Sequence, residues 1–332
     1  GLKQAHSMQM MAEVVHFVIN RLKLKQIILI GHSMGGYVSL ALLEKYSSLI
    51  KAVCLINSTA VADTEKRKKQ RLKAIRLAKN NSQVDKLWSI VPIYYVWHMT
   101  ALGSWDPRMI LMSVLVSLWG IRLTYNFARR GAYSWKFWSG EEDYRWEVLR
   151  KRKGFNNPFI WMLFNLFFIC TYQLTLIFLF TLPILVCLNT NVDHNLNWID
   201  GVLALLMISF IYIEFIADNQ QYAFQQEKHR RIANNEDLGE YKKGFISTGL
   251  WAIVRHPNYA MEQAIWLVFY LFSVHITGSW INWSIAGCVL LIILFKGSSD
   301  FSEELSAGKY PAYKEYQASV PRFIPFTKRK SN

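Results

Sequence analysis

The chain has few cysteines and little charge for its size. Its four cysteines stand singly inside apolar runs, so the sequence predicts neither a disulfide framework nor a cysteine-rich metal site. CxxC and HExxH patterns are also absent, and we expect no bound metal ion. Only 18% of the 332 residues are charged, whereas 52% are apolar, which excludes a disordered chain and an ordinary soluble domain.

Basic residues outnumber acidic ones. The 38 lysines and arginines against 23 aspartates and glutamates leave a net charge of +15. In so apolar a chain this excess is typical of contact with a membrane face or a phosphate-bearing ligand. The sequence contains no helix-turn-helix, finger or RNP pattern, so we expect no nucleic-acid partner.

The composition changes near residue 80, and we predict two domains, residues 1–80 and 81–332. The first contains a βαβ unit, because the short apolar runs Gln26–Ile30 and Lys51–Ile56 resemble buried parallel strands and Met34–Tyr46 between them predicts a helix. An amphipathic helix over Met8–Leu22 precedes it. The basic stretch Glu65–Lys79 follows, and we interpret it as a solvated linker helix.

Residues 81–332 predict an all-helical bundle that crosses a membrane about six times. A crossing takes about 17–25 residues, so the first two segments below are short and the third is long enough to bend at Pro183. The connections after the second and fourth segments contain eight and six basic residues, which places both termini in the cytoplasm. The segments are Leu87–Leu102, Met109–Leu123, Phe159–Leu188, Trp198–Ala217, Asn258–Ile276 and Trp280–Phe295.

The stretch Gly31-His32-Ser33-Met34-Gly35 matches G-x-S-x-G between a predicted strand and a predicted helix. It resembles the nucleophile turn of the α/β-hydrolase family over about residues 1–79, which implies that Ser33 stands at the nucleophile position. The later strands that bear that family's general base and orienting acid have no counterpart here. We therefore expect a truncated hydrolase fragment in which Ser33 is a vestigial, inactive nucleophile.

Two polar patterns stand out in the membrane part. If a helix begins at Pro257, Asn258 and Glu262 share one face, and Arg255 and His256 lie beside the positive end of the helix dipole, which favours an anionic ligand. A second stripe lies on one face of the fourth segment, and acidic groups near a bilayer usually face a polar cavity. Its members are Glu214, Asp218, Gln221 and Gln225.

The membrane part contains the string GLW…RHPNYxxE over residues 249–262, followed by SEE…KYPAYxxY…RFIP over residues 302–325. This combination resembles the steroid 5α-reductase C-terminal superfamily, in particular its branch of unknown function. The match runs from about residue 80 to residue 325 and includes SLWGIRL at residues 117–123. The resemblance implies a membrane-embedded enzyme that reduces a carbon–carbon double bond of a lipid-like substrate with NADPH. The cofactor-binding residues it implies are Glu214, Asp218, Gln221, Arg255, His256, Asn258, Tyr259, Glu262, Glu304 and Tyr310.

Position by position, the resemblance assigns Asn258 and Glu262 to the nicotinamide, Asp218 to the nucleotide pocket and Tyr310 to the adenosine. Such a reduction also needs an acid that polarises the substrate carbonyl. No glutamate between Val84 and Leu123 matches the acid of the steroid reductases. We therefore consider Tyr125 first and Tyr94 second for this role.

Two alternatives remain open. Isoprenylcysteine carboxyl methyltransferases, whose cofactor is S-adenosylmethionine, also have an R-H-P-x-Y helix start and a downstream pair of glutamates. This chain matches that pattern at Arg255-His256-Pro257, Tyr259 and Glu303-Glu304. They usually have glycine two residues after the tyrosine, where this chain has Met261. The second alternative is a non-enzymatic membrane protein with a vestigial hydrolase fragment.

Overall fold

The computed structural model describes residues 7–32, 34–56, 83–133, 144–188 and 195–327. The chain divides into two compact units, residues 1–75 and residues 76–332. The basic stretch Glu65–Lys79 and Ser33 lie outside the described residues.

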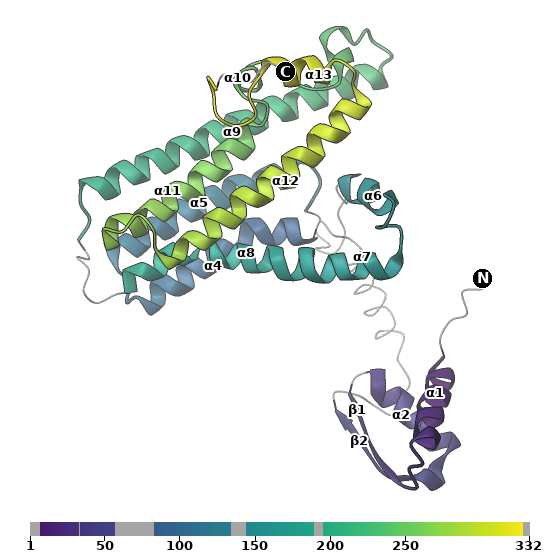
Figure 1. The fold of residues 1–332 in the computed structure, drawn as a ribbon. Coiled ribbons are helices and arrows are strands. Elements are labelled where there is room, and N and C mark those ends of the chain that lie inside the picture. Colours follow the sequence, from purple (N-terminus) through teal and green to yellow (C-terminus); the bar gives the residue numbers. More distant parts are fainter. Residues whose placement is uncertain (1–6, 33, 57–82, 134–143, 189–194, 328–332) are drawn as a thin grey trace. The chain divides into compact units, whose positions relative to one another are not determined.

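The N-terminal unit contains the predicted βαβ arrangement. The helix α1 (Met8–Arg21) is followed by β1 (Ile27–His32), α2 (Met34–Lys45) and β2 (Ile50–Ile56), and the two strands pair in parallel (Figure 1). Ala12, Ile19 and Leu42 form its small core. The described part of this unit has only these two strands, so Ile28 and Ile30 stay 62% and 68% exposed, because nothing in it covers the second face of the sheet.

The membrane unit is a bundle of helices, in which α9 packs against α5 and α11, and α11 also packs against α12 (Figure 1). Its elements are α4 (Gln83–Leu102), α5 (Pro107–Arg129), α6 (Tyr144–Lys151), α7 (Pro158–Phe164), η2 (Asn165–Gln173), α8 (Leu174–Leu179), η3 (Leu182–Leu188), α9 (Trp198–Ala233), η4 (Gly239–Lys243), α10 (Leu250–Ile253), α11 (Pro257–Thr277), η5 (Trp283–Ile285), α12 (Ala286–Lys309) and α13 (Tyr313–Ser319).

Five stretches of the described chain are long and apolar enough to cross a membrane, which makes the protein an integral membrane protein. They are Pro107–Arg129, Pro158–Leu188, Trp198–Ala233, Pro257–Thr277 and Trp283–Lys309. The expectation of a sixth crossing at Leu87–Leu102 is not confirmed. That segment lies in α4, a 20-residue helix packed against α5, but its Asp85, Lys86 and His98 reduce its apolar character.

The second crossing stretch changes its helix type three times. It begins as α7, continues as the π-helix η2 and returns to an α-helix in α8. The chain then narrows into the 3-10 helix η3, which contains Pro183, the residue at which we predicted a bend. Tyr172 of η2 donates to the carbonyl oxygen of Leu290 at 2.9 Å and thereby fixes this stretch to α12.

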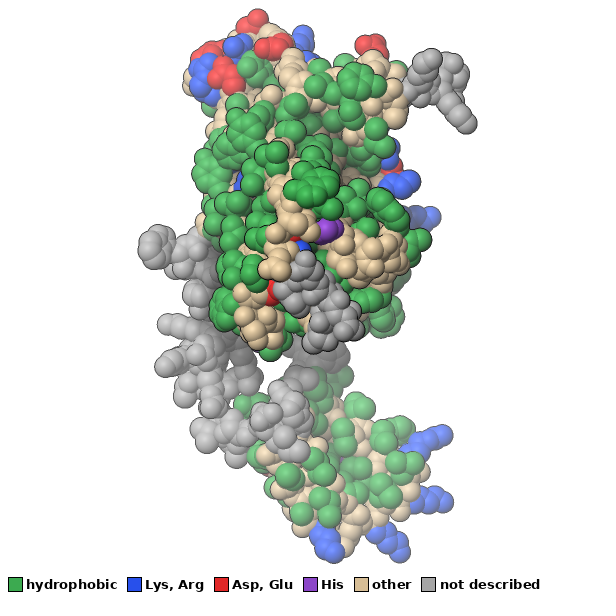
Figure 2. Space-filling model, turned by 90° about the vertical axis from the view of Figure 1, so that its left-hand side faces the viewer, with side chains coloured by type: hydrophobic (Ala, Val, Ile, Leu, Met, Phe, Trp, Pro, Cys, Tyr) green, Lys and Arg blue, Asp and Glu red, His purple; other side chains and the backbone are tan. Residues whose placement is uncertain are grey.

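The helix ends show which connections share a side of the bundle. Arg108 at the start of α5 is paired with Asp200 at the start of α9, with 2.8 Å between Nε and Oδ1. Arg129, at the other end of α5, donates to Asn219 well along α9. The two helices therefore run in the same direction, and the basic connections after each begin at the same end of the bundle. Figure 2 shows hydrophobic side chains over most of one face of the membrane unit and charged side chains grouped at its upper end.

Candidate functional site

A cluster of buried charged and amide side chains lies inside the bundle, where α5, α9 and α11 meet. Glu214 and Asp218 come from α9, one turn apart, and Glu262 comes from α11. All three are at most 5% exposed, so water solvates them little. The surrounding apolar side chains cannot solvate their charges either. The structure thus brings together the two polar stripes that the sequence placed on separate helices.

Arg122 of α5 holds the three carboxylates together. Its Nη1 lies 2.9 Å from Oε1 of Glu214 and 2.8 Å from Oδ2 of Asp218, and its Nη2 lies 3.3 Å from Oε2 of Glu262. One guanidinium therefore takes the place that a metal ion has in many carboxylate clusters. No group of His, Cys, Asp and Glu side chains able to hold a metal ion occurs among the described residues.

Glu262 is fixed by two tryptophans as well as by Arg122. The indole of Trp119 donates to Oε2 at 2.9 Å, and the indole of Trp266 donates to Oε1 at 3.0 Å. Both rings are fully buried, and they meet edge to face with 4.8 Å between centroids. Each oxygen of this carboxylate therefore accepts a hydrogen bond from a rigid apolar side chain, which holds Glu262 in one orientation.

Asp218 is held by amides. Asn126 of α5 donates from Nδ2 to Oδ2 at 2.8 Å, and Asn258 of α11 lies with Nδ2 3.5 Å from Oδ1. Asn258 stands in the first turn of α11, where the predicted start at Pro257 is confirmed. Asn126 in turn accepts two hydrogen bonds from Arg129, so polar contacts continue from the cluster toward the end of α5.

The cluster contains polar atoms that the protein leaves unpaired. Among the described residues, four buried side-chain atoms have no hydrogen-bond partner: Nε of Arg122 and Oε2 of Glu214 belong to the cluster, and Oε1 of Gln221 lies about one turn beyond Asp218 on α9. An unpaired buried polar atom costs about 1–3 kcal/mol. Two such atoms in one cluster, with a third nearby along α9, are typical of a site that a ligand completes.

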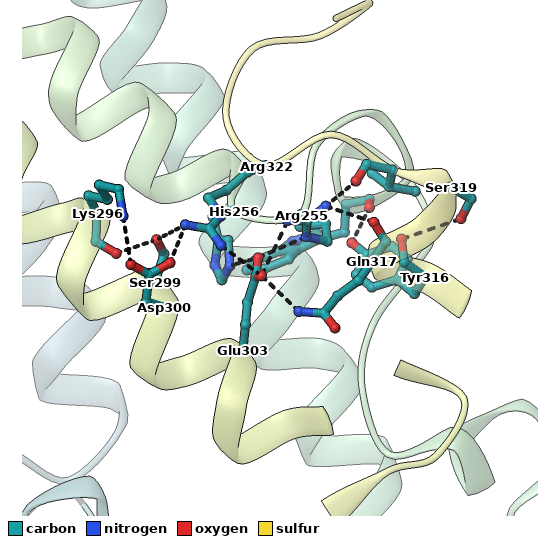
Figure 3. Close-up of polar contacts among 12 residues, drawn as sticks. Arg255, His256, Lys296, Ser299, Asp300, Glu303, Tyr316, Gln317, Ser319 and Arg322 are labelled. Atoms are coloured by element: carbon teal, nitrogen blue, oxygen red, sulfur yellow. Dashed lines mark hydrogen bonds and ion pairs between the residues drawn. The ribbon is translucent and has the colours of Figure 1, made fainter. Parts of the chain in front are cut away.

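A second network surrounds Glu303 of α12, next to the start of α11 (Figure 3). Oε1 of Glu303 lies 2.8 Å from Nε of Arg255 and 2.9 Å from Nε2 of His256, and Gln317 and Arg322 donate to Oε2 at 2.8 and 3.1 Å. From the sequence we expected Arg255 and His256 to face an anionic ligand. In the structure, the anion that they bind is the carboxylate of Glu303, and Pro321 and Arg322 accept hydrogen bonds from their backbone N–H groups.

Three further predicted cofactor residues lie toward the ends of α11 and α12. The hydroxyl of Tyr259 accepts a hydrogen bond from Arg145 of α6 at 3.2 Å, and Glu304 is paired with Arg152 at 2.8 Å. The ring of Tyr310 lies over Gly244, whose φ of +82° and lack of a side chain leave room for it. None of these three contacts the Arg122 cluster directly in the contacts that the structure gives.

The two tyrosines predicted as catalytic acids point outward. Tyr125 is 53% exposed beside Phe215, and Tyr94 is 64% exposed beside His98. Each lies on the outer surface of its helix, away from the face that contributes to the cluster. The structure therefore does not bring either hydroxyl to the buried carboxylates.

Several residues of the site were not selected from the sequence. Arg122 is the most important, and its position inside an apolar span was the available signal, because arginines in membrane helices face polar partners. Glu303 was noticed only as part of a glutamate pair, and the pattern does not distinguish it from the exposed Glu304. Trp119, Asn126 and Trp266 had no signal in one sequence, since each is an ordinary residue of a helical bundle.

Comparisons with known proteins match both parts of the chain. Residues 71–320 match a family described as protein of unknown function (DUF1295), and residues 3–123 match a family described as lipid-droplet associated hydrolase. The chain is 35% identical over 261 residues to the uncharacterized protein C594.04c of Schizosaccharomyces pombe, covering 74% of this chain and 73% of that protein. No solved structure matches.

Proposed function

The chain belongs to the DUF1295 family, and we propose that this family member is a membrane-embedded reductase that uses NADPH to reduce a carbon–carbon double bond of a lipid-like substrate. The proposal starts from the motif resemblance to the steroid 5α-reductase superfamily. One observation in the structure supports it most: Glu214, Asp218, Asn258 and Glu262 meet in one buried cluster whose unpaired polar atoms call for a ligand.

The chemistry of the cluster fits the polar end of a nicotinamide cofactor. The carboxamide of nicotinamide has N–H donors and a carbonyl acceptor, and the unpaired atoms include an acceptor, Oε1 of Gln221, and a donor, Nε of Arg122. Asn258, with its amide 3.5 Å from Asp218, is the more loosely held amide of the cluster and would turn toward such a ligand. The carboxylates, paired with Arg122, would also favour a cofactor that becomes positively charged when it is oxidised.

The protein would contribute positioning and electrostatics, and the bound cofactor would supply the hydride. Trp119, Trp266 and Arg122 hold Glu262 in one orientation, so the polar groups need little rearrangement during the reaction. The apolar residues around the cluster exclude water, which strengthens these interactions. A substrate dissolved in the bilayer would reach the site laterally, because the outer surface of the bundle is apolar.

The test is a titration of the full chain, purified in mild detergent, with NADPH and separately with S-adenosylmethionine. Nicotinamide fluorescence reports NADPH binding. We expect NADPH to bind and both Asn258→Ala and Glu262→Gln to weaken its binding about fivefold, since one lost hydrogen bond to a ligand is worth about 1 kcal/mol. Gln263→Ala is the matched control, because Gln263 lies on the same helix but donates to the backbone of Tyr259.

Binding of S-adenosylmethionine without binding of NADPH would replace the reductase proposal by the methyltransferase alternative. Binding of neither would leave a non-enzymatic membrane protein. If NADPH binds with equal affinity to the wild type and to both variants, the cofactor site lies elsewhere and the assignment to this cluster is wrong.

A further inference from the structure

A reduction of this kind needs a proton donor, and the tyrosines expected in that role lie on the outside of the bundle. The three carboxyl groups of the cluster are therefore the nearest acids to the proposed cofactor site. Their hydrogen bonds distinguish them. Both oxygens of Asp218 face amide or guanidinium donors, and both oxygens of Glu262 accept from indole N–H groups.

Glu214 differs from the other two. Its Oε1 lies 2.9 Å from Nη1 of Arg122, whereas its Oε2 is buried and has no partner. Its side chain is only 5% exposed, so water does not solvate the free oxygen. A bare carboxylate oxygen in an apolar interior is unfavourable, and a proton on that oxygen removes its charge.

The charges around Glu214 also favour a bound proton. The charged groups that face it are Arg122 from α5, Asp218 from its own helix and Glu262 from α11. If all three carboxyls were ionised, one guanidinium would face three negative charges. A single proton on the cluster reduces that imbalance, and the unpaired Oε2 is the oxygen with room for it.

We propose that Glu214 holds this proton on Oε2 and donates it to the lipid substrate, an inference that rests on the proposed reductase function. The reduced nicotinamide, when bound, would supply a hydride to one carbon of the double bond. Glu214 would supply a proton to the other carbon. The products are the saturated lipid, the oxidised nicotinamide and the Glu214 carboxylate, which stays paired with Arg122 through Oε1. Uptake of a proton from water restores the acid.

The first experiment observes the proton without any substrate. Infrared spectra of the full chain in lipid nanodiscs, in H2O and D2O, report the C=O stretching band of a protonated carboxylic acid. We expect this band in the wild type and its loss in Glu214→Gln, which keeps the side-chain volume and an oxygen for Arg122. Glu236→Gln is the control, since Glu236 is an exposed partner of Arg230 and its variant should keep the band.

The second experiment measures protons released on binding of the oxidised cofactor, which is positively charged at the nicotinamide. We expect binding of NADP⁺ to release about one proton from the wild type, whereas binding of NADPH releases none. The affinity of the wild type for NADP⁺ should therefore rise up to about tenfold for each unit increase in pH. Glu214→Gln should release no proton with NADP⁺. The wild-type infrared band should also disappear on addition of NADP⁺.

The outcomes separate the two proposals. If neither nucleotide binds the wild type, the reductase function fails, and with it the catalytic role of Glu214. If the nucleotides bind but the band is absent, or if Glu214→Gln releases the same proton as the wild type, only the inference about Glu214 fails. Loss of NADPH binding in Glu214→Gln would make Glu214 a cofactor ligand and would also overturn its role as the acid.

Discussion

A single arginine organises the polar interior of the membrane unit. Arg122 is 7% exposed and contacts carboxylates from two other helices, so its charge is compensated entirely by groups that are far apart in the sequence. Removing one partner of a buried ion pair leaves the other charges buried without compensation. The residue therefore matters for folding as well as for any ligand.

At this scale we predict that Arg122→Met destabilises the bundle by about 3–5 kcal/mol, the usual cost of breaking a buried ion pair. Unfolding of the purified protein by SDS titration, followed by tryptophan fluorescence, measures the change. Arg230→Met is the control: Arg230 is half-exposed and pairs with Glu227 and Glu236 in contact with solvent, so its loss should destabilise the protein far less. Equal losses in the two variants would contradict a central role for Arg122.

At the scale of elements, the C-terminal segment is held against the bundle by the Glu303 network. Glu303 of α12 binds Arg255 and His256 just before α11, and it also binds Gln317 of α13 and Arg322 beyond it (Figure 3). Backbone hydrogen bonds from residues 255 and 256 to Pro321 and Arg322 reinforce the contact. One buried carboxylate thus joins three segments of the chain.

We predict that Glu303→Gln loosens this segment, because a neutral amide replaces charge-assisted hydrogen bonds worth about 1.5–3 kcal/mol each. Limited trypsin digestion should then cleave after Arg322 about tenfold faster or more, since each 1.4 kcal/mol changes the open population tenfold. Glu304→Gln is a matched control from the neighbouring position, whose exposed side chain pairs with Arg152. Unchanged cleavage in Glu303→Gln would show that other contacts hold the segment.

At the scale of the whole molecule, the chain contains two separate cores. The membrane unit has a large core of residues from all its long helices, whereas the apolar core in the described part of the N-terminal unit consists of Ala12, Ile19 and Leu42. A two-stranded sheet with one open face gains little from burial. We therefore expect the N-terminal unit to be the less stable of the two.

We predict that Leu42→Ala, at a position 1% exposed, destabilises the N-terminal unit by about 2–5 kcal/mol. Hydrogen–deuterium exchange of the full chain should become faster in α1, α2 and both strands and remain unchanged in α5, α9 and α11. Leu24→Ala, at a position 45% exposed, should change neither set. Faster exchange in both units after Leu42→Ala would indicate that their stabilities are coupled.

The same separation gives a functional prediction. Ser33→Ala should leave NADPH affinity and any reductase activity within error of the wild type, because the resemblance assigns Ser33 to a different chemistry and to the other unit. Hydrolysis of a p-nitrophenyl ester by the full chain serves as the second measurement. An esterase signal that disappears in Ser33→Ala would show that the hydrolase fragment is active.

Hydrophobic patterning alone determined the class of this protein. Runs of apolar residues, their lengths and the punctuation by Gly and Pro predicted the βαβ unit, four of its element boundaries to within one or two residues, and the helix start at Pro257. They also predicted five of the crossing segments, because burial in lipid imposes a local requirement on composition. The crossing predicted at α4 is not confirmed, since this helix has the length of a crossing segment but falls below the hydropathy of the five others.

The composition of the site was decided only in three dimensions. A single sequence places Glu214 and Asp218 on one helical face and Asn258 and Glu262 on another, but it contains no information on which helix faces which. Packing of α5 against α9 supplies Arg122, the cation that the pattern lacked, whereas Tyr125 of the same helix is left 53% exposed. Helical periodicity fixes the faces of each element, whereas the pairing of faces depends on side-chain packing between segments distant in the chain, and so only the tertiary structure shows it.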